Sequence, residues 1–152
     1  MEIQINFTYG DESLLRFPLE ELARFVLEWE ARPKNTEVSI SFVSDSEIAE
    51  LNERYRQVVG PTDVLSFVCD EEDEELYALD DDAAMIVLGD VVIAPDVALR
   101  QTQEYGTSFE EEINLLLVHG LLHLCGYDHI EDDEAEHMEA LEEEILASWA
   151  DR

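Results

Sequence analysis

A short stretch in the C-terminal third of the chain carries three histidines at fixed offsets, His119, His123 and His129. His119 and His123 are four residues apart in an apolar run, so on a helix they stack on one face with Cβ atoms about 5–6 Å apart. Gly126 can take the left-handed conformation that ends a helix and turns the chain back, which would carry His129 to the same place. The spacing therefore predicts that three imidazole rings converge.

Three converging imidazoles predict a site for one divalent metal ion, and zinc is the expected ion. Zinc accepts imidazole nitrogen, and three protein ligands leave a fourth tetrahedral position for water. Cys125 is a poor fourth ligand, because a residue two positions beyond His123 points away from the histidine face of the helix. Asp128 is expected to accept a hydrogen bond from one of the rings, since metal-bound histidines usually need such a partner.

The same offsets occur in the H-E-x-x-H-x-x-G-x-x-H signature of metzincin proteases. The second position of that signature is a glutamate that serves as the general base, whereas this chain has Gly120. The sequence thus predicts a zincin-like metal helix without the base of a peptidase. A zinc peptidase stays open as an alternative function, and position 120 argues against it.

Alternation and caps predict four strands and five helices in a single domain that spans residues 1–152. The strands are expected at 3–9, 38–42, 64–69 and 85–94, and the helices at 18–32, 44–56, 95–105, 108–125 and 133–149. Near-continuous apolarity over 64–69 is typical of a strand in a sheet interior. Capping boxes are expected at Ser44 with Glu47 and at Ser108 with Glu111.

Several side chains are assigned to the core or to the surface by these patterns. Tyr55 is expected to point inward from its helix, and the last helix is expected to bury one face made of Met138, Leu141, Ile145 and Trp149. His137 lies among charged residues and is expected to be exposed. The acidic segment 70–82 is expected to be a solvated loop that joins a long hairpin, because it lacks the turn glycine of a calcium-binding loop.

The charge balance is extreme: 39 acidic residues face 8 basic ones, for a formal net charge of −31. Such a balance opposes nucleic-acid binding, which rests largely on Lys and Arg at phosphates. An RNA-binding chain of this kind needs its few arginines at the site, or a medium in which salt screens the surface, the Debye length being about 3 Å at 1 M. We therefore expect adaptation to high internal salt. The absence of a long apolar run and of a signal-peptide pattern leads us to expect a cytoplasmic protein that is not embedded in a membrane.

The stretch from His119 to His129 resembles the H-G-x-L-H-L-x-G-Y-D-H signature of the YbeY family of endoribonucleases, the rRNA maturation factors of bacteria. The resemblance continues upstream in the segments LNERYR (51–56), PTDVLSF (61–67) and LGDVVI (88–93). It implies an α+β fold, with a small mixed sheet of about four strands packed by helices and akin to the zincin proteases.

The resemblance also implies the activity and the partners. The family suggests a zinc-dependent, single-strand-specific endoribonuclease that acts in rRNA maturation, especially at the 3′ end of small-subunit rRNA, and in ribosome quality control. The expected partners are rRNA and the small ribosomal subunit, with ribosomal proteins as further candidates. Arg56 matches an arginine implicated in the activity of the family on RNA, so it joins the three histidines as an expected catalytic residue. Arg54 and Arg100 are weaker candidates for contacts with the RNA backbone.

Two aspartates and one further function stay open at this point. Asp63 and Asp90 match family positions, but hydrogen bonds at a turn or a strand end explain them equally well. A non-enzymatic assembly factor is the second alternative function. In that case the metal would only fix the C-terminal turn, and the acidic surface would dock on basic ribosomal proteins.

Overall fold

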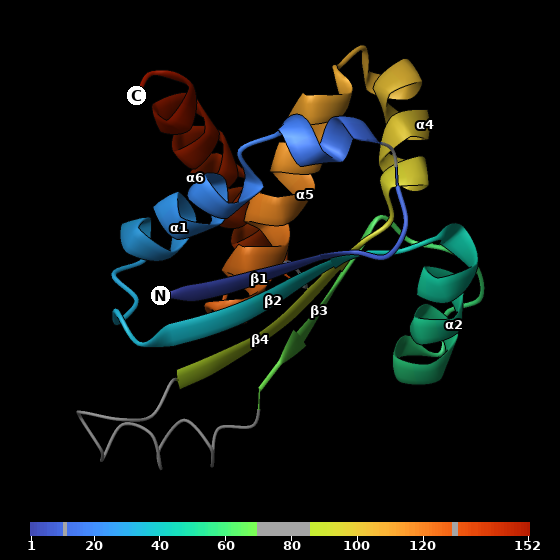
Figure 1. The fold of residues 1–152 in the computed structure, drawn as a ribbon, viewed down its shortest axis with the longest axis horizontal. Helices are drawn as coiled ribbons and strands as arrows, with labels where there is room; N and C mark the ends of the chain where they lie inside the picture. Colours follow the sequence, from blue (N-terminus) through green and yellow to red (C-terminus); the bar gives the residue numbers. More distant parts are fainter. Residues whose placement is uncertain (11, 70–85, 129–130) are drawn as a thin grey trace.

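The fold is α+β and is built on one mixed sheet of four strands, as the sequence predicts (Figure 1). The computed structural model describes residues 1–10, 12–69, 86–128 and 131–152. The strand order is β1-β2-β4-β3; β1, β2 and β4 run parallel, and β3 runs antiparallel to β4. The strands are β1 (Glu2–Phe7), β2 (Thr36–Phe42), β3 (Val64–Val68) and β4 (Ile86–Ile93).

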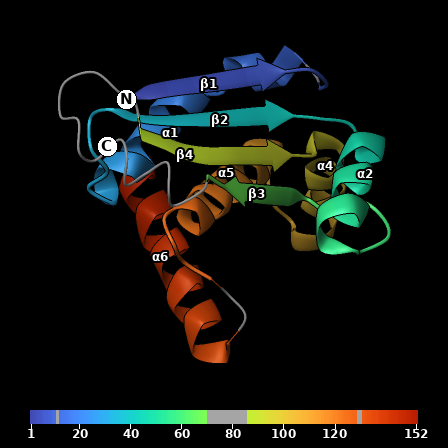
Figure 2. The ribbon, with the colours of Figure 1, turned by 90° about the horizontal axis from the view of Figure 1, so that it is seen from below.

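Helices cover the two faces of the sheet unequally. One face is covered by α1, α5 and α6, while α2 lies on the other side at the end near β3 (Figures 1 and 2). The helices are η1 (Glu12–Arg16, a 3-10 helix), α1 (Leu19–Trp29), α2 (Asp45–Arg56), α4 (Pro95–Tyr105), α5 (Phe109–Leu124) and α6 (Asp132–Ala150). None of the helices in the described ranges is both long and apolar enough to cross a membrane.

Helix α5 is the centre of the molecule. It contacts β3, β4, α1, α4 and α6, and beyond its first turn nearly every position is apolar, so it can be buried on all sides. Ile113, Leu117, Val118 and Leu121 are fully buried in the main core. Two of the three expected catalytic histidines, His119 and His123, therefore stand on the central, largely buried helix of the fold.

Both ends of α5 are fixed by the local signals that the sequence carries. At the start, the Ser108 side chain accepts a hydrogen bond from the backbone N–H of Glu111, and the Glu111 carboxylate accepts one from the N–H of Ser108. At the end, Gly126 has φ +105°, and the N–H of Tyr127 donates to the carbonyl of Leu122. This is the hydrogen bond of a Schellman turn, and it confirms Gly126 as the residue that turns the chain.

The expectation that β3 lies inside the sheet is wrong, because β3 is the edge strand next to β4. Its apolarity has another cause. One face of β3 packs on α5, and the other packs on the cluster around α2, where Leu65 joins Val43 and Ile48. A strand covered on both faces reads as continuously apolar even at an edge.

The inward placement of Tyr55 is also wrong, since 57% of this side chain is exposed. Tyr55 follows Ile48 and Asn52 on the buried face of α2, but the sheet ends at β3 and leaves little for its ring to pack on. Other assignments are confirmed: Met138 and Ile145 are buried, and His137 is exposed. The antiparallel pairing of β3 and β4 is that of the predicted hairpin, and the acidic segment that joins them falls outside the described residues.

Candidate metal centre and cleft

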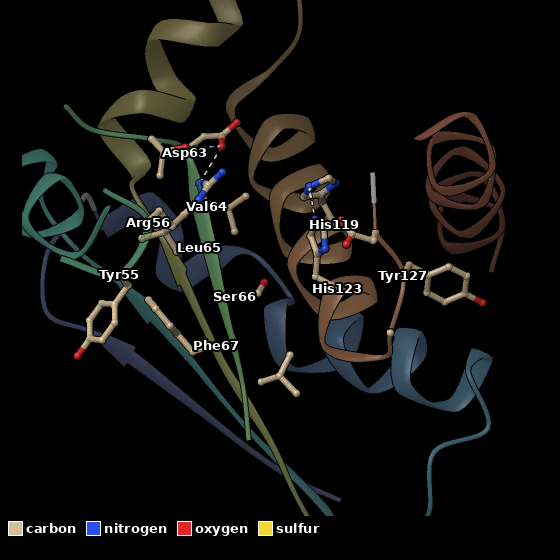
Figure 3. A pocket seen from close by; sticks show the side chains of 14 residues that line it. Tyr55, Arg56, Asp63, Val64, Leu65, Ser66, Phe67, His119, His123 and Tyr127 are labelled. Carbon is tan, nitrogen blue, oxygen red and sulfur yellow. Dashed lines mark hydrogen bonds between the residues drawn. The ribbon is translucent and has the colours of Figure 1, made fainter. Parts of the chain in front are cut away.

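His119 and His123 direct the same ring nitrogen toward one point beside α5 (Figure 3). Their Nε2 atoms are 3.1 Å apart, with the rings inclined at 82°. Two imidazole ligands of one tetrahedral zinc ion, each bonded at about 2.0–2.1 Å, have nitrogens about 3.3 Å apart. The observed separation is close to that value, so this pair fits two corners of a zinc site.

A buried carboxylate holds the ring of His119. Nδ1 of His119 is hydrogen-bonded to Oε1 of Glu142 in α6, whose side chain is only 8% exposed. Because a carboxylate only accepts hydrogen bonds, the proton of a neutral imidazole sits on Nδ1 and the lone pair is left on Nε2. This is the tautomer that binds a metal through Nε2.

Sequence reasoning missed Glu142, although a signal for it existed. Met138, Glu142, Ile145 and Trp149 follow one another at intervals of four, three and four residues along the buried stripe of α6, and all four are buried. A charged residue at a core position of an otherwise apolar stripe requires a partner, since an isolated buried charge is costly. The spacing marks Glu142 as unusual, but it does not reveal which side chain pairs with it.

The third expected ligand, His129, lies outside the described residues, so the three-histidine site stays a prediction. Within the described ranges, no three His, Cys, Asp or Glu side chains gather as a metal site. Asp128, the expected hydrogen-bond partner of a ligand, lies at the end of the turn and lines the cleft beside the histidines. Its role likewise stays a prediction.

The histidines open into a cleft of about 850 Å³ between α5, β3 and the end of α2. Arg56, the last residue of α2, lines this cleft together with His119 and His123. Figure 3 shows Arg56 on the β3 side and the two histidines on the α5 side. Arg56 forms no ion pair with another described residue, so its guanidinium can bind an anion in the cleft.

The other two candidate arginines are not among the residues that line the cleft. The guanidinium of Arg100 pairs with the carboxylate of Asp45 at 2.9 Å and thereby links α4 to the start of α2. The guanidinium of Arg54 lies 6.0 Å from the centre of the Tyr55 ring. Of the three arginines, the structure brings only Arg56 to the histidines.

The loop between Arg56 and β3 is held by hydrogen bonds. The Asn52 side chain donates to the carbonyl of Gly60 at 2.9 Å. The Asp63 carboxylate accepts from the N–H of Val64 at 2.8 Å and from the Gln101 side chain at 3.2 Å. Asp63 thus has the strand-end role that was one of its two explanations, while Asp90 is exposed on the open face of the sheet.

Gly120 lies where α5 presses most closely on the sheet. A Cβ atom at this position would come within 2.6 Å of Cγ1 of Val91, and the hydroxyl of Ser66 donates to the carbonyl of Gly120 at 2.9 Å. Position 120 therefore faces β3 and β4 and has no room for a side chain. The glutamate base of a metzincin could not be accommodated at this point, and this counts against the peptidase alternative.

The turn after α5 is tied to α1 by Tyr127. Its hydroxyl donates to the carboxylate of Glu30 at 3.3 Å. Burial, followed by the hydrogen bond and the charge of Glu30, raises the pKa of Tyr127 above its usual value. The hydroxyl therefore stays protonated, and it holds the segment that leads toward His129.

Comparisons with known proteins agree with the resemblance seen in the sequence. The family described as Endoribonuclease YbeY matches residues 4–150. A relative from Heliobacterium modesticaldum, named Endoribonuclease YbeY, is 47% identical over 131 residues, which cover 84% of this chain and 79% of the relative. One of the same name from Lachnoclostridium phytofermentans is 35% identical over 155 residues, covering 95% and 92%. The solution structure of TM1509 from Thermotoga maritima matches with a TM-score of 0.61 and 31% identity, over 98% of this chain and 92% of that one.

Proposed function

The chain belongs to the YbeY family of endoribonucleases, and we propose that it is a zinc-dependent enzyme that cleaves single-stranded RNA during rRNA maturation. Its proposed main substrate is the 3′ end of small-subunit rRNA, with a further role in ribosome quality control in the cytoplasm. The observation that carries the proposal is the pair of Nε2 atoms, 3.1 Å apart, that shares a cleft with Arg56.

The metal would be held by His119, His123 and, on the sequence argument, His129. When bound, zinc lowers the pKa of water toward about 7 and polarises a phosphoryl oxygen. Glu142 orients the ring of His119 and leaves Nε2 free of a proton. Arg56 would donate two parallel hydrogen bonds to the phosphate at the scissile bond and stabilise the charge that develops there during cleavage.

The shape of the cleft and the charge of the protein support a preference for single strands. The cleft of about 850 Å³ admits a few nucleotides, whereas a duplex presents its phosphates over a much longer surface. The net charge of −31 would repel the dense phosphates of a duplex more strongly than those of a single strand. A single strand can instead enter the cleft with its bases turned toward the protein.

A non-enzymatic assembly factor stays a second candidate, and the acidic surface is the observation that favours it. The exposed side of α6 carries Glu136, Glu139, Glu143 and Glu144, which suits a basic ribosomal protein. In this case the metal would serve only to hold the C-terminal turn.

A complementation assay separates the two functions. The variant His123→Ala is expected to lose both zinc uptake and processing of a small-subunit rRNA precursor, while His137→Ala, at an exposed histidine of α6, keeps both. If His123→Ala lost zinc and still processed the precursor, the assembly-factor function would hold. With purified protein, cleavage should stop with a chelator and return with zinc. The chemical ends of the RNA products then identify the nucleophile. A 2′,3′-cyclic phosphate would indicate attack by the ribose 2′-OH and rule out direct hydrolysis.

A further inference from the structure

Two aromatic rings form a ledge on the wall of the cleft that lies across from the histidines (Figure 3). The ledge consists of Tyr55 at the end of α2 and Phe67 on β3. Their ring centres are 5.2 Å apart, with the rings inclined at 70°, so one ring stands edge-on to the other. Both residues line the same cleft as Arg56, His119 and His123.

Tyr55 is the exposed member of this ledge, whereas Phe67 is half-buried against the cluster around α2. Tyr55 occupies the buried face of α2, yet 57% of its side chain is exposed because the sheet ends at β3. Val68, the next residue on β3 to line the cleft, is 62% exposed. Large apolar side chains that are exposed together, at a cleft, mark a binding surface more often than isolated ones do.

We propose that the aromatic ledge stacks a nucleobase of the single-stranded RNA whose phosphate Arg56 binds. Arg56 follows Tyr55 directly in the chain, and both line the cleft, so a phosphate on the arginine places a neighbouring base beside the ring. This inference rests on the proposed function, and it names a nucleobase as the part of the RNA that the aromatic ledge binds.

The charge of the protein strengthens the choice of a base as the occupant. With 39 acidic and 8 basic residues, the chain gains little affinity from phosphate contacts, and salt weakens that contribution further. Stacking of bases on aromatic side chains does not depend on charge and tolerates any base. A strongly acidic RNA enzyme therefore needs such a surface more than a basic one does.

The test measures RNA binding separately from cleavage. Wild-type protein and the variants Tyr55→Ala, Tyr55→Leu and Tyr55→Trp are titrated, with a chelator present, against a fluorescent single-stranded RNA at low and at high salt. Tyr55→Ala and Tyr55→Leu are expected to bind about 5- to 150-fold more weakly, the range seen when a stacking residue is removed, and Tyr55→Trp is expected to bind at least as tightly as wild type. The loss should be the same at both salt concentrations, whereas the loss caused by Arg56→Ala should shrink at high salt.

A matched control is Tyr105→Ala, because Tyr105 is also a highly exposed tyrosine, at 63%, but stands at the end of α4 and does not line the cleft. This variant should bind RNA like wild type. A probe with 2-aminopurine gives a signal specific to stacking: its fluorescence should be quenched by wild type and by Tyr55→Trp, and less by Tyr55→Leu. Equal RNA binding and equal quenching by wild type and Tyr55→Leu would contradict base stacking on the ledge. This is the result expected if the ledge binds a protein instead.

The two proposals fail in different ways. If wild-type protein cleaves RNA and Tyr55→Ala binds RNA unchanged, the ledge is wrong and the endoribonuclease stands. If binding depends on Tyr55 but zinc-loaded wild type leaves every RNA intact, the ledge stands and the nuclease activity is wrong.

Discussion

The buried carboxylate of Glu142 in α6 is hydrogen-bonded to Nδ1 of His119 in α5. The two residues are 23 positions apart in the chain. The contact joins α6 to α5 through Nδ1 of His119. It leaves Nε2 as the nitrogen that could bind a metal ion. The proposed metal site would therefore depend on a helix that supplies none of its expected ligands.

Replacing Glu142 should weaken metal binding without removing a ligand. Glu142→Ala is expected to lower zinc affinity about 10- to 100-fold, the usual effect of removing the hydrogen-bond partner of a ligating histidine. Glu142→Gln should lose less, since its amide oxygen still accepts the hydrogen bond. Competition with a coloured chelator measures the affinity, and Glu143→Ala, at the exposed neighbour, is the control. Equal affinities for Glu142→Ala and Glu143→Ala would show that the contact does not support the metal.

His129 is the ligand that only the sequence predicts, and thermal unfolding can test it. Zinc in 100-fold excess over its Kd should stabilise the wild-type protein by about 2.7 kcal/mol through mass action. His129→Ala should lose most of this shift in Tm, while His137→Ala should keep it. A full zinc-dependent shift in His129→Ala would exclude this residue as a ligand.

The parts of the site that the sequence predicts are those encoded within a few turns of chain. The capping box of Ser108, the turn at Gly126 and the spacing of His119 and His123 act between near neighbours, and the structure contains each of them. Each can be recognised because its hydrogen bonds join residues no more than about five positions apart.

The parts that sequence reasoning missed depend on contacts between distant segments. The partner of Glu142 is determined by how α6 packs on α5, and the exposure of Tyr55 is determined by where the sheet stops. The edge position of β3 was hidden because α2 and α5 cover its two faces. In each case the local sequence pattern indicates whether a side chain is apolar or polar, but it does not show which distant segment packs against it.

Gly120→Ala should destabilise the protein although alanine favours a helix. The added Cβ would lie 2.6 Å from Cγ1 of Val91, whose side chain is fully buried, so the helix or this side chain must shift. Overpacking of this kind costs about 1–3 kcal/mol, against a gain of about 1 kcal/mol in helix propensity. Urea unfolding should therefore show a net loss of up to about 2 kcal/mol. Val91→Ala makes room for the added Cβ. The double variant Gly120→Ala/Val91→Ala should therefore lose less stability than the two single variants lose together. If the two losses simply add, the contact with Val91 is not the cause.

Arg56→Ala should reduce RNA cleavage while leaving the metal site intact. Loss of one group that stabilises charge in the transition state typically lowers kcat about 10²- to 10³-fold. Arg56→Lys should recover part of the rate, since lysine keeps the charge but cannot form two parallel hydrogen bonds. Single-turnover cleavage and zinc titration measure the two effects separately, with Arg24→Ala on α1 as a control for the loss of one positive charge. Cleavage by Arg56→Ala at the wild-type rate would remove this residue from the mechanism.

The stability of the protein should rise with salt. At a net charge of −31 the acidic side chains repel one another in the folded state more than in the expanded unfolded chain. Raising KCl from 0.1 M to 1 M shortens the Debye length from about 10 Å to about 3 Å, so the midpoint of urea unfolding should move to higher urea. A triple variant on the exposed side of α6, with Glu139→Gln, Glu143→Gln and Glu144→Gln, should be more stable than wild type at low salt and should respond less to KCl. If wild type and this variant respond equally to KCl, or if both are most stable in dilute buffer, repulsion among the carboxylates is not what limits stability.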